Sequence, residues 1–119
     1  MRILVVEDHV DVASLLASAL TREGHDVITT HDAEEALAVL AHHRPDALFL
    51  DVLLGELSGI DLLRQLRKTD TTLPVVLLTG VPASELEETR HLGVLEIIEK
   101  PFALKRLPQL LHKVAGRRT

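Results

Sequence analysis

The sequence predicts one α/β domain, a doubly wound (βα)5 fold whose five parallel strands are ordered 2-1-3-4-5. Short apolar runs alternate along the chain with longer stretches that carry apolar residues at helical spacing. Such alternation is typical of a parallel sheet with helices on both faces. The runs also differ in polarity, since three are wholly apolar and two contain polar residues. The order 2-1-3-4-5 places the apolar runs at the centre of the sheet and the mixed runs at its edges.

The five predicted strands are short. The central three are the apolar runs Ile3–Val6, Ala47–Leu50 and Val75–Leu78, in which aliphatic residues dominate. The edge strands are Val27–Thr30 and Leu95–Ile98, whose polar residues are threonine and glutamate.

Each predicted strand is followed by a helical stretch. Four of these stretches repeat an aliphatic residue every three or four positions, which gives each helix an apolar stripe for the core. The fourth stretch in chain order, near Glu85–His91, has one large apolar residue, Leu86, so we expect the least firmly packed helix there. Ser84 and Glu87 fit a capping box at its start. The four stripes are Val12, Leu15, Leu16, Ala19 and Leu20; Ala33, Ala36, Leu37 and Leu40; Gly59, Leu62, Leu63 and Leu66; and Leu104, Leu107, Leu111 and Val114.

Composition limits the classes of function. The 119 residues suit a single domain over 1–119, with a loose tail at Gly116–Thr119. The absence of cysteine excludes a disulfide framework, a Cys-ligated metal centre and a thiol nucleophile. Two aromatic residues and a net charge of −5 argue against direct nucleic-acid binding. No apolar run is long enough for a membrane span or a signal peptide, so we expect a cytoplasmic protein.

Polar side chains follow four of the predicted strands. Glu7 and Asp8 follow the first, Asp51 the third, Thr79 the fourth and Lys100 the fifth. Ligands of open α/β sheets bind outside the carboxyl ends of the strands, where the strand order reverses, so we expect these side chains to share one crevice. The alternative is that they are unrelated strand-end residues exposed to solvent. The occurrence of such residues after four strands at once disfavours this alternative.

Three carboxylates in one crevice repel one another, and a hard divalent cation removes that cost. Mg²⁺ prefers carboxylate and water oxygens. An acidic, Mg²⁺-ready site beside a lysine and a threonine suits a phosphoryl group, and one carboxylate there can act as the nucleophile.

The segments ILVVEDH, FLDVLLGELSG, VVLLTG and IIEKPF, in this order and spacing, resemble the receiver domain of two-component response regulators. This CheY-like resemblance extends from Arg2 to about Ala115. It implies a flavodoxin-like fold and a phosphorylation-controlled signalling module rather than an enzyme. The partners that it implies are a sensor histidine kinase or histidine phosphotransfer protein and a downstream effector or output domain, and it allows a homodimer. The chain would be a stand-alone receiver or the N-terminal receiver of a longer regulator.

The resemblance also assigns roles to the polar residues. Asp51 would be the phosphoacceptor. Asp8 would bind Mg²⁺ directly and Glu7 through water, and the backbone carbonyl of Leu53 would supply another metal ligand. Thr79 would be the switch hydroxyl, and Lys100 would pair with the phosphoryl group. The peptide bond from Lys100 to Pro101 would be cis.

Four positions depart from the usual pattern of this family. Ile97 stands where an aromatic switch residue is common, which leaves phosphorylation credible but puts the usual readout in doubt. Gly55 replaces a common proline, so we expect a more mobile loop after Asp51. Gly80 replaces a common alanine. Pro108 falls inside the last helical stretch and must lie in its first turns or bend the helix.

Other functions were weighed against the same residues. An Asp-nucleophile phosphatase commonly has an acid two residues after the nucleophile, where this chain has Leu53. A nucleotide-binding flavodoxin-like protein needs a phosphate loop after the first strand, where this chain is acidic. A pseudo-receiver that docks partners without phosphorylation remains the alternative. His9 follows Asp8, and a loop histidine exposed to solvent is the favoured interpretation of it.

Overall fold

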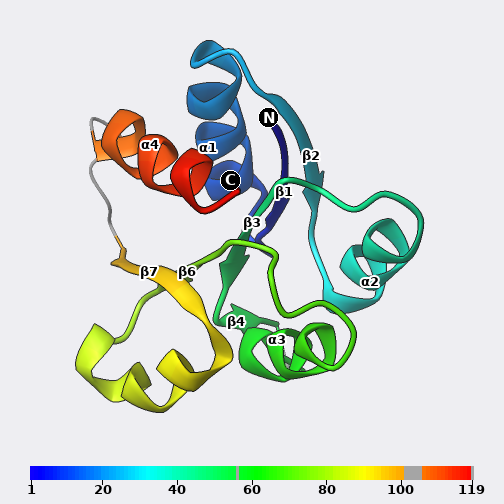
Figure 1. Cartoon of the computed structure of the whole chain (residues 1–119), viewed down its shortest axis with the longest axis vertical. Coiled ribbons are helices and arrows are strands. Elements are labelled where there is room, and N and C mark those ends of the chain that lie inside the picture. The colour runs from blue at the N-terminus through cyan, green and yellow to red at the C-terminus, as the bar shows by residue number, and fades with distance from the viewer. Residues whose placement is uncertain (56, 101–105, 119) are drawn as a thin grey trace.

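Five parallel strands form the central sheet of the computed structural model, which describes residues 1–55, 57–100 and 106–118 (Figure 1). The strand order is β2-β1-β3-β6-β7. This is the predicted order 2-1-3-4-5, because β4 and β5 belong to a separate hairpin. The sheet consists of β1 (Arg2–Val6), β2 (Asp26–Thr30), β3 (Ala47–Asp51), β6 (Val75–Thr79) and β7 (Val94–Glu99).

Helices cover both faces of this sheet (Figure 1). One face packs against α1 (Val10–Arg22) and α4 (Leu107–Arg118), and the other against α2 (Ala33–His42), α3 (Gly59–Arg67) and the 3₁₀ helix η1 (Ala83–Leu92). Side chains alternate between the two faces along each strand. Ile3 and Val5 of β1 therefore join the core on one face, and Leu4 and Val6 join the core on the other.

The apolar runs of the central strands are fully buried, as their composition predicts. Three of the four apolar stripes face the core as expected at the described residues. The stripe of α1 is partly wrong. Leu16 and Leu20 are buried, but Leu15 is 55% exposed and Ala13 takes a buried position instead. Leu104 of the last stripe lies outside the described residues.

The fourth helical stretch forms as a 3₁₀ helix rather than an α-helix. Its N-cap is Pro82, with no side-chain cap, so the capping box predicted at Ser84 is wrong. Leu86 has non-helical backbone angles, and the buried hydroxyl of Thr89 donates to the carbonyl of Leu86 over 2.6 Å. Such a side-chain bond competes with regular helix. Leu86 and the partly buried Leu92 are the large apolar residues of η1 that pack against the core, which is little packing to oppose that bond.

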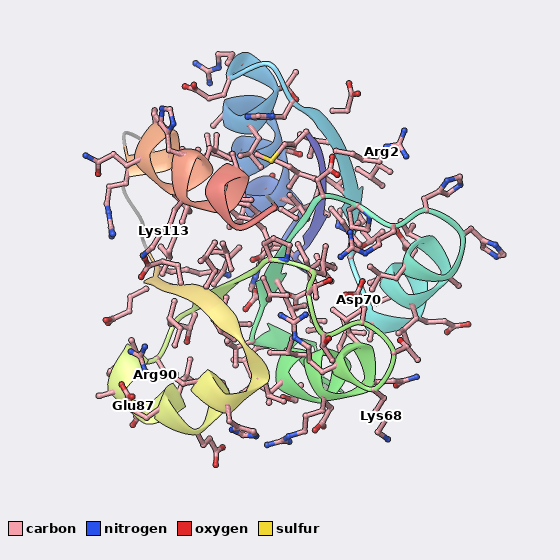
Figure 2. All side chains as sticks on the ribbon, in the orientation of Figure 1. Arg2, Lys68, Asp70, Glu87, Arg90 and Lys113 are labelled. Atoms are coloured by element: carbon pink, nitrogen blue, oxygen red, sulfur yellow. The ribbon has the colours of Figure 1, made fainter. Side chains whose placement is uncertain are left out.

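Outside its two buried residues, η1 is largely exposed. Arg90 Nε donates to Glu87 Oε2 over 2.7 Å, and Figure 2 shows both side chains on the outer side of η1. The helix ends at Leu92, and its C-cap residue Gly93 has a left-handed φ of 73°.

Two expectations concern the last helix, α4: the position of Pro108 and the loose tail from Gly116. Pro108 is its second residue, where a missing N–H costs nothing, so the helix need not bend there. The tail expected to be loose from Gly116 is helical as far as Arg118, because the helix continues through the glycine. No helix in the described part of the chain is both long enough and apolar enough to span a membrane.

The segment after β3 forms a small antiparallel hairpin that the sequence does not predict. It pairs β4 (Leu53–Leu54) with β5 (Leu57–Ser58). The Ser58 side chain then caps α3 by accepting from the Ile60 N–H over 3.1 Å. A Cβ on Gly59 would overlap the carbonyl oxygen of Asp51. Glycine at this position therefore lets α3 begin directly against the end of β3.

Candidate functional site

Three of the predicted site residues gather at the carboxyl ends of the adjacent strands β1 and β3. Glu7 and Asp8 follow β1 directly, and Asp51 is the last residue of β3. Ligand atoms of Glu7, Asp8, His9 and Asp51 all lie within 4.8 Å of one another. The structure thus brings together all three carboxylates in the crevice where the strand order reverses. We call these four residues the acidic cluster.

Lys100 follows β7 and joins the acidic cluster through two hydrogen bonds. Its Nζ donates to Glu7 Oε2 over 2.7 Å and to Asp51 Oδ2 over 2.8 Å. The backbone N–H of Lys100 donates to the Thr79 carbonyl over 2.7 Å, which fixes the start of the lysine beside the end of β6. One ammonium group therefore bridges two carboxylates, of which Glu7 is completely buried.

Burial and mutual contact set the protonation of this trio. Burial raises the pKa of Asp51, and the neighbouring Glu7 raises it further, while Lys100 acts in the opposite direction. Burial also acts to raise the pKa of Glu7, but its contacts with Asp51, Lys100 and His9 outweigh burial and lower it. The pKa of Lys100 is raised because its bonds to both carboxylates outweigh its own burial. The lysine is therefore held in its charged form as the internal counterion.

The loop after Asp51 contributes two backbone donors. The N–H of Leu53 donates to Asp51 Oδ1 over 3.0 Å, and the N–H of Gly55 donates to Asp8 Oδ2 over 2.9 Å. Gly55 has a φ of 65°. A proline could provide neither that angle nor the N–H, so glycine at this position ties the loop to the acidic cluster. The metal-binding role of the Leu53 carbonyl and the mobility of this loop stay predictions.

His9 is more closely involved than the sequence suggests. Its side chain is 71% exposed, as expected for a loop histidine. Its Nδ1, however, lies 3.1 Å from Glu7 Oε1 and 3.3 Å from Asp8 Oδ1, and its N–H donates to Glu7 Oε1 over 3.2 Å. His9 is also the N-cap residue of α1. His9 follows two acids and precedes a helix, so the chain holds its side chain close to those acids. This position in the sequence is the signal that could have identified His9 as part of the site.

Thr79 lies at the same edge of the sheet, but its hydroxyl forms hydrogen bonds within its own loop. Its hydroxyl accepts from the Val81 N–H over 3.0 Å and donates to the Val81 carbonyl over 3.1 Å. No hydrogen bond within the described ranges joins this hydroxyl to Asp51. Its role as a switch stays a prediction. So does the cis bond to Pro101, which lies outside the described residues.

The acidic cluster fits a hard divalent cation. Asp8 Oδ1 is buried and lacks a hydrogen-bond partner among the residues that the structure describes, which is costly for a carboxylate oxygen. Most of the available donor atoms are carboxylate oxygens, which Mg²⁺ prefers. A cation at this place would supply the missing partner and reduce the repulsion among the carboxylates.

Comparison with known sequences points to one family. The family model of the response regulator receiver domain matches residues 3–112. The response regulator MprA of Mycobacterium avium (strain 104) is 43% identical over 108 residues, which are 90% of this chain and 47% of that protein. MprA of Mycobacterium tuberculosis (strain H37Rv) is 42% identical over the same share of each chain. The chain thus spans about half the length of these curated relatives.

Solved structures agree with the sequence comparison. The receiver domain of NtrX from Brucella abortus superposes with a TM-score of 0.88 at 37% identity, over 96% of this chain and 98% of that one. The receiver domain of the Francisella response regulator 1452 has a TM-score of 0.90 at 26% identity, over 99% and 98% of the two chains. A CheY-like receiver protein from Methanospirillum hungatei JF-1, 24% identical with a TM-score of 0.89 over 98% of this chain and 94% of that one, shares the fold.

Proposed function

The chain belongs to the family of response regulator receiver domains, which are modules of two-component signalling, and we propose that Asp51 is its phosphoacceptor. The observation that carries the proposal is the position of Asp51. Its carboxylate lies at the carboxyl end of a central strand, 2.8 Å from the Lys100 ammonium and within the acidic cluster. A nucleophilic oxygen, a fixed cation and a cation-binding group of carboxylates are the parts that phosphoryl transfer needs.

The proposed step is a simple displacement at phosphorus. A carboxylate oxygen of Asp51 attacks the phosphorus of a phosphohistidine and forms a P–O bond. The P–N bond breaks, and its electron pair remains on the imidazole nitrogen of the donor. Lys100 is close enough to Asp51 to pair with an oxygen of the transferred group, and its raised pKa keeps it charged for that role.

Mg²⁺ is part of the proposal. Glu7, Asp8, Asp51 and the Leu53 carbonyl would hold it, with Glu7 acting through water. The ion supplies positive charge that stabilises the phosphoryl oxygens when it is bound. The chain's own contribution is to present Asp51 as a carboxylate. Lys100 favours this ionised form, while burial and Glu7 oppose it.

The proposed partners follow from the family. The donor would be a sensor histidine kinase or a histidine phosphotransfer protein, acting in the cytoplasm. The signal would pass to an effector or an output domain, through contacts that change on phosphorylation, and a homodimer is compatible with this role. We propose no direct contact with nucleic acid for this domain, given its net charge of −5. Thr79 would change partners from Val81 to the phosphoryl group during the response.

Labelling with acetyl phosphate tests the assignment of Asp51. The chain should acquire one acid-stable, base-labile phosphoryl group when Mg²⁺ is present and none in excess EDTA. Asp51→Asn should abolish labelling. Asp61→Asn, which changes an exposed carboxylate on α3, is the matched control and should label normally. Equal labelling of the Asp51 variant would contradict the assignment. Failure of the unchanged chain to label from acetyl phosphate or any phosphohistidine donor would favour the pseudo-receiver alternative.

A further inference from the structure

We propose that His9 is an additional metal ligand of the acidic cluster and gives the site a preference for nitrogen-accepting divalent metals such as Co²⁺ over Mg²⁺. This inference rests on the metal site of the proposed function. The inference concerns which metal the site prefers, since oxygen ligands alone would favour hard cations.

The position of the imidazole carries the inference. His9 Nδ1 lies 3.1 Å from Glu7 Oε1 and 3.3 Å from Asp8 Oδ1. Ligands held about 2.1 Å from one ion at right angles stand roughly 3 Å apart, so His9 Nδ1 and Asp8 Oδ1, which are 3.3 Å apart, have nearly the spacing of two direct ligands. The nearby Asp8 Oδ1 is the buried oxygen without a hydrogen-bond partner. A nitrogen donor therefore lies beside an oxygen donor of the acidic cluster.

The chain holds the imidazole in this orientation. His9 is the N-cap residue of α1, and its own N–H donates to Glu7 Oε1 over 3.2 Å. Nδ1 faces the carboxylates, while most of the side chain is exposed. With its proton on Nε2, the neutral ring would present the Nδ1 lone pair to a metal and keep the N–H in solvent. Binding would exchange the Nδ1 contact with Glu7, in which Nδ1 carries the proton, for a metal bond to the Nδ1 lone pair.

A second histidine near the cluster does not share this geometry. His31 Nδ1 lies 3.1 Å from the backbone carbonyl of Glu7 rather than from its carboxylate. His31 is also absent from the group of side chains that could hold one ion. Among the histidines of the described ranges, His9 is the one whose ring nitrogen lies in that group.

The chemistry of the ligands predicts the selectivity. Mg²⁺ prefers oxygen ligands and gives up its waters reluctantly, so an imidazole adds little to its binding. Affinity for nitrogen and oxygen ligands together rises from Mn²⁺ towards Cu²⁺, and an imidazole strengthens that trend. His9 should therefore increase the affinity for Co²⁺ while leaving that for Mg²⁺ nearly unchanged.

Metal binding by itself tests this inference. Isothermal titration would measure Co²⁺ and Mg²⁺ affinities of the full chain, and the visible absorption of Co²⁺ would report nitrogen ligation. Titration of the Co²⁺ complex with Mg²⁺ separates this site from other surface histidines, because Mg²⁺ displaces only Co²⁺ that shares its ligands. The variants are His9→Ala and His9→Gln, with His42→Ala, an exposed histidine at the end of α2, as the matched control.

We expect both His9 variants to lose at least about tenfold in Co²⁺ affinity, since even outer-shell partners of metal sites contribute that much. Their Mg²⁺ affinity should change by less than about twofold. His42→Ala should match the unchanged chain in both. If both His9 variants bind Co²⁺ as tightly as the unchanged chain, with the same absorption spectrum, the role of His9 is refuted while the Mg²⁺ site stands. If the unchanged chain binds neither metal, both the inference and the proposed metal site are wrong.

Discussion

Replacing Lys100 by methionine removes an ammonium group that bridges Glu7 and Asp51. Nζ lies 2.7 Å from Glu7 Oε2 and 2.8 Å from Asp51 Oδ2, and the Glu7 side chain is 0% exposed. Methionine is also unbranched and is one atom shorter than lysine, so it replaces most of the apolar stem and omits the ammonium group. Two buried carboxylates are then left within a few ångströms of each other without a counterion.

The expected loss of stability follows from that burial. Removing one partner of a buried ion pair costs about 3–5 kcal/mol. The Lys100 side chain is 21% exposed, so solvent offsets part of the cost, and we expect a loss of about 3 kcal/mol at pH 8. A loss of this size is a large share of a typical domain stability but leaves the fold in place.

The loss should depend on pH. Burial and Glu7 raise the folded-state pKa of Asp51, and without the lysine the bond from the Leu53 N–H is the described interaction that still acts to lower it. A carboxyl group whose pKa is raised by folding destabilises the fold when it ionises. The deficit of Lys100→Met should therefore shrink as the pH falls and Asp51 takes up a proton. Adding Asp51→Asn should recover most of the loss at pH 8.

Urea unfolding between pH 5 and 8, without divalent metal, measures this effect. Lys113→Met is the matched control, because Lys113 forms an exposed pair with Glu96 over 2.9 Å. Exposed pairs contribute about 0–1 kcal/mol, with little dependence on pH in this range. Equal free energies of unfolding for Lys100→Met and the unchanged chain at pH 8, or a deficit that grows as the pH falls, would refute the bridging role.

Three further predictions follow from other contacts. Gly59→Ala should cost about 1–3 kcal/mol in urea unfolding, because its Cβ would overlap the Asp51 carbonyl, whereas Gly116→Ala, with open space around its Cβ, should not destabilise. Asp70→Asn should cost about 2 kcal/mol at pH 7, because Arg44 holds the folded-state pKa of Asp70 at about 2. That stability is present above the ordinary pKa of an aspartate and is lost as the pH falls towards 2. The free energies of unfolding of the two chains should therefore converge at low pH, and parallel curves would contradict the role of Arg44. In amide hydrogen exchange, a beryllofluoride mimic of the phosphoryl group should change residues 80–91 more than 95–98, because Ile97 has no aromatic ring to move; a larger change in β7 would be evidence against this.

Much of the fold was predictable because the sheet is sorted by polarity. Runs such as Val75–Leu78 are wholly apolar because both faces of a central strand are covered, and the strand order follows from that difference. The β4–β5 hairpin was not predictable, since two-residue strands have no periodicity to detect. The 3₁₀ form of η1 was not predictable either, since the bond from the buried Thr89 hydroxyl to the Leu86 carbonyl leaves no trace in the spacing of apolar residues.

The site was predictable to a similar extent, and for a related reason. Parallel strands end at one edge of a sheet, so residues that follow strands, such as Glu7 and Asp51, must meet there. The bridge from Lys100 to both of them, and the turn of His9 towards Glu7, depend on side-chain orientations that no pattern encodes. The bonds of the Thr79 hydroxyl with Val81 were not predictable for the same reason.

Chemical mapping identifies which aspartate receives the phosphoryl group, and we expect it to be Asp51. The chain would be treated with acetyl phosphate and Mg²⁺ and then reduced with borohydride, which converts an aspartyl phosphate to homoserine. Peptide mass spectrometry should find homoserine at position 51 and at no other aspartate, and only when donor and Mg²⁺ are both present. Homoserine at Asp8 or another aspartate, with Asp51 unchanged, would contradict the assignment.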